Sequence, residues 1–318
     1  MSQAPPLPPH ASFPPGEPMP AKGFLGRHPL LVGLAVVLLF LVILIVLLAV
    51  GLSQSGRPER FSLGDKIAVV KLEGVILDSQ ETMEQLRRHR RNRSVKAVVL
   101  RVDSPGGAVG PSQEIFRQVQ RLVQEKTVVA SFGGVAASGA YYAACPATKI
   151  MANPGTLTGS IGVVMEITNL EGLMQWIRIR HQVIKSGKFK DVGSPFREMT
   201  PAERAFLQGF VDDVHAQFEE AVAEGRHLDS AAVHKLADGR IFTGRQAKEL
   251  GLVDEIGNLE DAIRLAADLV GIKGEPEVIW PERPRPFWLA RLAQDIAKQV
   301  VEEARPSSIR ALYLLPGY

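Results

Sequence analysis

Residues 30–52 form an apolar run of 23 residues without a charged side chain. A helix of this length crosses the hydrocarbon core of a bilayer, which is about 30 Å thick. The apolar region of a cleaved signal peptide is usually only about 7 to 15 residues long, so the run predicts a retained transmembrane helix. The small residues Ala49, Val50 and Gly51 leave cleavage at its end open as the alternative.

The residues before this run predict an extended tail. Eight prolines fall among the first twenty positions, so residues 1–29 cannot form a regular helix and have little apolar surface to bury. Basic residues flank the run on both sides, Lys22 and Arg27 before it and Arg57 and Arg60 after it. The distribution of positive charge therefore does not indicate which end faces the cytoplasm.

The composition of the chain excludes several classes of protein. Basic and acidic residues are nearly balanced, 37 against 34, and the basic ones are scattered, which argues against nucleic acid as a partner. The single cysteine, Cys145, can form neither an intrachain disulfide nor a thiolate metal site. The 266 residues after the apolar run suffice for one large domain stabilised by its hydrophobic core.

In this longer part, short β-branched runs alternate with helical patterns, which is typical of βαβ units and a parallel sheet. Strands are expected over residues 66–72, 95–102, 127–132, 148–152 and 161–165. Helices are expected over residues 81–90, 113–124, 201–224 and 259–269, with turn, helix and strand over 239–257. Thr200 is the expected N-cap of the longest helix, with Glu203 three residues later. The predicted fold class is α/β.

The first candidate for a functional site is the segment 103–107, which follows the expected strand 95–102. Ligands of open α/β sheets bind at the carboxyl ends of strands, and two adjacent glycines let backbone amides approach a reacting group. Such amides bind an oxyanion or a phosphate, but the spacing matches neither a P-loop nor a dinucleotide-binding fingerprint. A plain turn is the alternative.

Ser138 is the second candidate. The stretch 133–142 follows the expected strand 127–132 and begins a helix of small residues. A serine at such a strand-to-helix turn exposes its hydroxyl and is placed like a nucleophile, although the motif is not a G-x-S-x-G elbow. An N-cap or a packed small residue is the alternative interpretation.

A serine nucleophile needs a general base, and the residues leave two kinds open. Of the seven histidines, only His181, at the head of an apolar stretch, is kept as a candidate. Lys185, Lys188 and Lys190 lie in a Gly- and Ser-containing segment that is expected to follow a strand. A lysine accepts a proton only as the neutral amine, which requires a buried environment, and a solvated basic loop is the alternative.

Three motifs, taken in order, resemble the signal peptide peptidase SppA family. They are SPGG at 104–107, AASGAYYAA at 136–144 with TLTGSIGV at 156–163, and SGKFKDVGSPFREMT at 186–200. The resemblance runs over roughly residues 64–272. It implies a ClpP/crotonase-like fold of repeated ββα and βαβ units after one N-terminal transmembrane helix. It also implies peptide-bond hydrolysis by a Ser-Lys dyad, without a metal or other cofactor.

The resemblance carries roles to five positions. Ser138 corresponds to the nucleophile, and Lys190, the lysine before Asp in the SGxxKD pattern, to the general base. Ser160 corresponds to the serine that hydrogen-bonds and holds this lysine. Gly107, the second glycine of SPGG, implies an amide of the oxyanion hole, and the Gly139 amide is the expected second donor.

Two positions depart from the family pattern. Ala140 stands where the family commonly has a second glycine, which adds a methyl group near the nucleophile and is expected to tighten the pocket. Asp103 stands where many members have Asn, which puts a carboxylate near the expected oxyanion hole. Neither change removes a catalytic group.

The resemblance also implies a location and partners. The expectation is a single-pass protein of the bacterial inner membrane, with the catalytic domain on the periplasmic side. Signal peptide remnants and other apolar peptides are the expected substrates, and the family's assembly predicts a ring or dome homo-oligomer. Residues 53–280 are then the peptidase domain and residues 281–318 a C-terminal helix and tail.

The C-terminal tail lies beyond the resemblance. Residues 286–304 carry an apolar stripe that predicts an amphipathic helix, packed on protein or on a membrane surface. The apolar residues 311–315 resemble a substrate, so we hypothesise that the tail reaches an active site as a pseudo-substrate. Two other interpretations of the whole chain are a catalytically silent membrane scaffold and a crotonase-like acyl-CoA enzyme.

Overall fold

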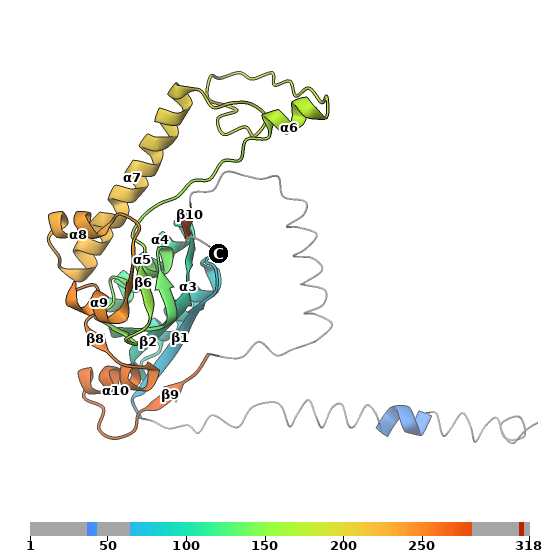
Figure 1. Ribbon diagram of the computed structural model, residues 1–318. Helices are drawn as coiled ribbons and strands as arrows, with labels where there is room; N and C mark the ends of the chain where they lie inside the picture. Colours follow the sequence, from blue (N-terminus) through green and yellow to red (C-terminus); the bar gives the residue numbers. More distant parts are fainter. Residues whose placement is uncertain (1–36, 43–63, 282–311, 315–318) are drawn as a thin grey trace, which may run out of the picture. The chain divides into compact units, whose positions relative to one another are not determined.

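The computed structural model describes residues 37–42, 64–281 and 312–314 (Figure 1). The chain separates into two compact units, Met1–Ser62 and Leu63–Tyr318. Of the predicted transmembrane helix, residues 37–42 are helical and exposed; the remainder, and the predicted N-terminal tail, lie outside the described residues. No helix within the described ranges combines the length and apolar composition needed to cross a bilayer.

A mostly parallel sheet forms the centre of the second unit (Figure 1). Strands β1 (Lys66–Glu73), β2 (Val95–Ser104) and β4 (Thr127–Ala137) pair in parallel in its middle. The first half of β4 pairs further with β5, and its last residues pair with β6. The outer strands described are β5 (Lys149–Ala152), β6 (Leu157–Gly159), β7 (Ile241–Thr243), β8 (Glu255–Ile256) and β9 (Glu277–Ile279).

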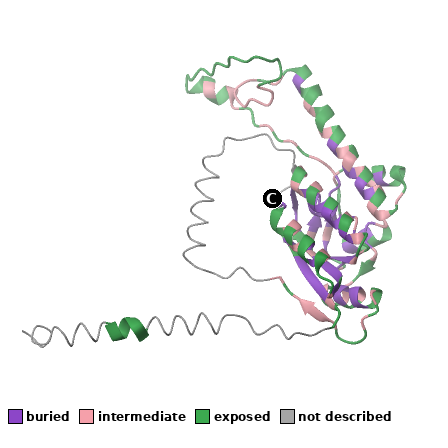
Figure 2. Cartoon of the chain, turned by 180° about the vertical axis from the view of Figure 1, so that it is seen from behind, coloured by how far each residue is buried: buried purple, intermediate pink, exposed green. Residues whose placement is uncertain are grey.

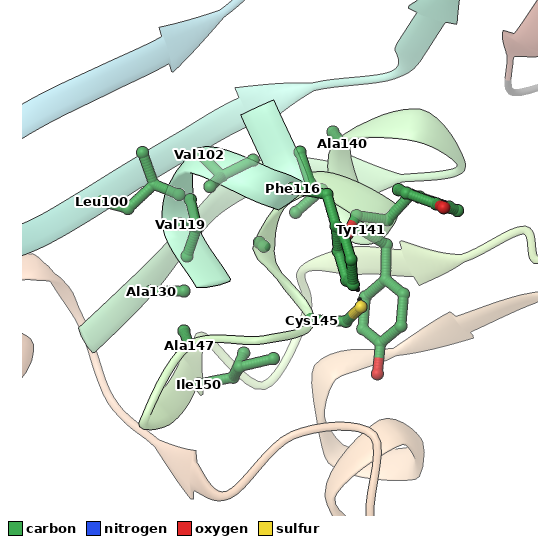
Figure 3. Close-up of a cluster of buried hydrophobic side chains, with 14 of the residues drawn as sticks. Leu100, Val102, Phe116, Val119, Ala130, Ala140, Tyr141, Cys145, Ala147 and Ile150 are labelled. Atoms are coloured by element: carbon green, nitrogen blue, oxygen red, sulfur yellow. Dashed lines mark hydrogen bonds between the residues drawn. The ribbon is translucent and has the colours of Figure 1, made fainter. Parts of the chain in front are cut away.

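Helices cover both faces of this sheet. Side chains on both faces of the central strands are therefore buried, and the sequences of these strands are continuous apolar runs. Successive residues such as Val69 and Val70 belong to two different cores. The smaller core is closed by α10 (Leu259–Leu269). The larger core is closed by α3 (Gln80–Arg91), α4 (Val109–Val123), α5 (Gly139–Ala144) and α8 (Ser230–Leu236), with α9 (Gly244–Glu249). Figure 2 shows the buried residues gathered in and against the sheet, and Figure 3 shows α4 and α5 side chains in the larger core.

The longest helix, α7 (Pro201–Arg226), starts as predicted. The Glu203 backbone N–H donates to Thr200 Oγ1, and the Thr200 N–H donates to the Glu203 carboxylate at 2.9 Å. This capping box satisfies two backbone donors that a helix start otherwise leaves without partners.

The second half of α7 packs tightly on α5. The Phe218 ring lies 4.9 Å from the Tyr142 ring, and the Cys145 thiol donates to the Ala221 carbonyl at 3.4 Å. At Gly225 a Cβ would come within 2.7 Å of the Cys145 carbonyl oxygen, so only glycine fits. The first half of the helix, in contrast, leaves Phe206 and Phe210 exposed.

Residues 162–200, called the arm below, contain no buried residue (Figure 2). The arm includes α6 (Glu171–Trp176) and exposes large apolar side chains such as Trp176 and Ile184. The strand expected before Lys185 is wrong, because residues 177–184 form no strand. Such a segment has no sheet edge and no core to pair with, so its apolar side chains do not make it a strand.

Most predicted elements are confirmed, including α10 over its expected residues and the turn, helix and strand over 239–257. The strand expected at 161–165 is wrong: β6 ends at Gly159, because Ser160 has a φ of 49°, which a strand cannot accommodate. The amphipathic helix expected over 286–304 lies outside the described residues.

Two phenylalanines on α7 provide a test of this packing. Phe218→Ala removes a fully buried ring and is expected to lower the free energy of unfolding by about 3 to 5 kcal/mol. Phe210→Ala, on the exposed half of the same helix, is expected to cost less than about 1 kcal/mol. Urea unfolding followed by circular dichroism measures both, and equal losses would contradict the described burial.

Candidate active site

Three strand ends meet at the carboxyl edge of the sheet. In the parallel register, Ser104 at the end of β2 pairs with Ala136 of β4, and Ala137 pairs with Gly159 of β6. The segments that follow these strands carry the predicted groups 104–107, Ser138 and Ser160. The fold therefore brings the first two predicted motifs together at the edge where open α/β sheets bind ligands.

Ser138 joins β4 to α5 with a strained backbone. Its φ of 54° and ψ of −124° are unusual for a residue with a side chain, and its N–H donates to the Gly159 carbonyl at 2.8 Å. It occupies the N-cap position of α5, but its side chain makes no capping hydrogen bond. The hydroxyl is buried and has no hydrogen-bond partner among the described residues. The N-cap alternative therefore does not account for this serine.

The SPGG segment is fixed by backbone contacts with Ile76. The Ile76 N–H donates to the Gly106 carbonyl at 2.9 Å, and the Ala108 N–H donates to the Ile76 carbonyl at 2.8 Å. A Cβ on Gly107 would lie 2.1 Å from the Ile76 carbonyl oxygen, so no other residue fits there. Glycine is thus required at position 107 because two backbone segments approach closely there. A plain turn would not impose this requirement.

The structure shows where the two residues that depart from the family pattern lie. The Asp103 carboxylate accepts the Val135 N–H at 3.1 Å and lies against Gly133, where a Cβ would be 2.8 Å from Asp103 Cγ. The carboxylate is therefore hydrogen-bonded to the backbone of β4. The Ala140 methyl is fully buried in the larger core (Figure 3).

Ser160 lies directly after β6 and is buried. Its N–H donates to the Arg240 carbonyl at 2.8 Å, which anchors this turn to the segment before β7. Thr158 of β6 donates its hydroxyl to the Ala136 carbonyl at 2.7 Å, so β6 and β4 are also joined through a side chain. Ser160 thus follows the strand that pairs with the one leading to Ser138.

Lys190 lies in the arm, in a turn where its N–H donates to the Gly187 carbonyl at 3.1 Å. Lys190 is exposed, and the Ser138 hydroxyl has no partner, so no hydrogen bond joins them within the described part of one chain. The other candidate bases have different contacts: Lys185 pairs with Asp191, Lys188 Nζ lies over the Phe189 ring, and the His181 ring packs on Phe196. The predicted Ser138–Lys190 dyad stays a prediction.

The C-terminal residues Leu312–Leu314 form strand β10, which pairs antiparallel with β3 (Gly106–Ala108). In this register Tyr313 lies opposite Gly107. A backbone edge beside the expected oxyanion hole therefore accepts an extended peptide segment by strand addition. The sequence hypothesis placed this tail at an active site, and the pairing puts its backbone next to the SPGG segment.

Cys145 has no part in this site. Burial raises the pKa of the Cys145 thiol well above its usual range, so this cysteine is not a nucleophile at neutral pH. Among the residues that the structure describes, no three His, Cys, Asp or Glu side chains are arranged to hold a metal ion.

Comparison with known proteins places the chain in a family. The model of peptidase family S49 matches residues 120–273. A Synechocystis protein provisionally named a protease is 43% identical over 72% of this chain and 84% of its own length. An Enterococcus faecium protein provisionally named signal peptide peptidase SppA is 37% identical over 64% of each chain. The chloroplastic serine protease SPPA of Arabidopsis thaliana is 32% identical over 70% of this chain and 35% of its own.

These matches confirm the resemblance drawn from the three motifs, and the mixed α/β sheet fits the expected ClpP/crotonase-like fold. The chain belongs to peptidase family S49 and is a protease of the SppA family.

Proposed function

We propose that the chain is a membrane-anchored serine endopeptidase that hydrolyses signal peptide remnants and other apolar peptides, with Ser138 as nucleophile and Lys190 as general base. The observation that carries this proposal is Ser138, whose hydroxyl is buried on a strained backbone and has no hydrogen-bond partner among the described residues. Buried polar groups are almost always hydrogen-bonded, and strained backbones gather at active sites. A capping or packing role explains neither property.

The proposed reaction needs only this chain's own groups. Ser138 Oγ attacks the scissile carbonyl carbon while the neutral Lys190 amine takes the hydroxyl proton. Amides of Gly107 and Gly139 stabilise the oxyanion, and losing one such donor typically costs about 3 to 4 kcal/mol. The Lys190 ammonium then protonates the leaving amine. A water molecule deprotonated by the same lysine clears the acyl-enzyme.

The base is proposed to come from a second copy of the chain. Ser138 is buried and has no hydrogen-bond partner in the described part of the chain, whereas Lys190 lies on the exposed arm. The arm exposes large apolar side chains, among them Trp176 and Ile184, and exposed apolar side chains of this size are typical of protein contacts. A homo-oligomer that covers these side chains would place Lys190 of one copy beside Ser138 and Ser160 of its neighbour, where that Ser160 could hold the lysine as in the family.

The pairing of β10 with β3 supports peptide substrates. A substrate that pairs antiparallel with Gly106–Ala108 passes its carbonyl groups beside the Gly107 backbone. We propose a membrane anchor because of the apolar run 30–52. The resemblance to the SppA family is the basis for proposing that the catalytic domain lies on the periplasmic side of the bacterial inner membrane.

Mixing two inactive variants tests both the dyad and its division between copies. Ser138→Ala and Lys190→Ala are each expected to lose at least about 1000-fold in kcat on an Ala- and Leu-rich fluorogenic peptide. Co-expressed in equal amounts, they are expected to regain about one quarter of the wild-type rate, since one site in four then receives both groups. Lys188→Ala, two residues away, is the control with near wild-type activity.

Other outcomes would point to a different general base or to a different function of the chain. No recovery on mixing, with both variants assembled, would place the base in the same chain as the nucleophile. Full activity of Lys190→Ala would move the base to Lys185, Lys188 or His181. A folded wild-type protein without peptidase activity would favour the scaffold interpretation, and CoA-dependent turnover the acyl-CoA interpretation.

The tail provides a separate prediction. Because residues 312–314 occupy the edge that a substrate needs, deleting residues 311–318 is expected to lower the apparent KM at least about twofold at unchanged kcat. The assay is peptide hydrolysis by full-length and shortened protein. Intact-mass spectra of the wild type and Ser138→Ala show whether the tail is also cleaved. Unchanged KM together with identical full-length termini would contradict a pseudo-substrate tail.

A further inference from the structure

The turn that carries Lys190 is held by a network of ion pairs, although the arm around it has no buried residue. Arg197 Nε donates to the Asp191 carboxylate at 3.0 Å, and Arg197 Nη2 donates to the Asp191 backbone carbonyl at 3.4 Å. Lys185 pairs with the same carboxylate. Asp191 is the residue next to Lys190, so these contacts fix the backbone from which the Lys190 side chain starts.

The other end of the network is the start of α7. Arg197 Nη1 donates to Glu203 Oε2 at 2.9 Å, and Arg197 Nη2 contacts the other oxygen of the same carboxylate. The Glu203 side chain is only 4% exposed and belongs to the capping box with Thr200. Arg197 therefore connects the Lys190 turn to a helix whose second half is packed in the core. A planar guanidinium can bridge two carboxylates in this way, whereas a lysine ammonium is a point charge.

The network also sets the charge beside Lys190. Hydrogen bonds from Arg197 and then Lys185 hold the pKa of Asp191 well below its usual range, and Arg197 with the Thr200 backbone lowers the pKa of Glu203 to about 2. Both carboxylates are thus ionised at neutral pH, and the two cations balance them. A carboxylate without such partners, one residue from a lysine, would stabilise the ammonium form and oppose its action as a base.

We propose that Arg197 is a positioning residue for the general base: it fixes the Lys190 turn to α7 and keeps the Asp191 carboxylate from pairing with the Lys190 ammonium. The inference rests on the proposed role of Lys190 as base. The partners of the Arg197 guanidinium are Asp191, Glu203 and the Glu198 carbonyl, so its proposed action on the reaction passes through Lys190. The charged groups around the turn are Lys185, Lys188 and Arg197 of the arm, Asp191, and Glu203 of α7.

The test is the pH dependence of kcat in the full-length protein. Arg197→Ala is expected to lower kcat at pH 7.5 at least about tenfold, with little change in KM, because the base is displaced. The limb on which activity rises as Lys190 loses its proton is expected to move to higher pH by about half a unit to one unit, since Asp191 then keeps only Lys185 as a partner and favours the protonated Lys190. Arg180→Ala, which removes another arginine of the arm, is the control that leaves both quantities unchanged.

Two further variants separate the effect of the Asp191 charge from the effect of fixing the Lys190 turn to α7. Adding Asp191→Asn to Arg197→Ala removes the carboxylate and is expected to return the pH limb to the wild-type position while kcat stays low. Arg197→Lys keeps the charge but cannot bridge both carboxylates, so it is expected to keep the wild-type limb with a reduced kcat. A purely structural role for Arg197 would lower the amount of folded, assembled protein without moving the limb.

The outcomes distinguish this inference from the proposed function. If Lys190→Ala is inactive and Arg197→Ala matches Arg180→Ala in kcat and pH profile, the dyad stands and the role of Arg197 is wrong. A lower kcat with an unmoved limb in Arg197→Ala overturns the electrostatic part. If Lys190→Ala is fully active, both the proposed base and the role of Arg197 are overturned.

Discussion

The parallel pairing of β4 with β2 on one side and β6 on the other determines where the groups of the site lie. Ser104 pairs with Ala136, and Gly159 pairs with Ala137, so the loop after each strand starts at nearly the same level of the sheet. The Ser138 N–H then donates to the Gly159 carbonyl. A shift of one residue in either register would reverse the faces of the strand and separate these loops.

The site stores strain that the core must offset. A residue held at φ 54° costs about 1 to 3 kcal/mol, and Gly107 is held where a side chain would collide with Ile76. Immediately after Ser138, every residue of α5 is buried, and Figure 3 shows Ala140 and Tyr141 of this helix in the core. Burial of these small and aromatic side chains, including Tyr141, fixes the direction in which the chain leaves the nucleophile.

Local signals in the sequence predicted the elements that local forces determine. The start of α7 was predictable from Thr200 and Glu203 because a capping box involves residues three apart. The end of β6 was not, because the positive φ of Ser160 depends on the distant Arg240 carbonyl. Ser138 could be singled out from its strand-to-helix turn. The contacts of Arg197 could not be, because they depend on how the arm turns back on the start of α7.

The tight packing of α7 on α5 has a consequence for communication between sites. At one end, Gly225 and Phe218 fix α7 against the helix that begins after Ser138. At the other end, Glu203 holds the turn of Lys190 through Arg197. If Lys190 serves a neighbouring copy, as proposed, α7 connects the nucleophile of one site to the base of the next. Loss of this packing would then disturb two sites, the one whose nucleophile precedes α5 and the one that Lys190 serves.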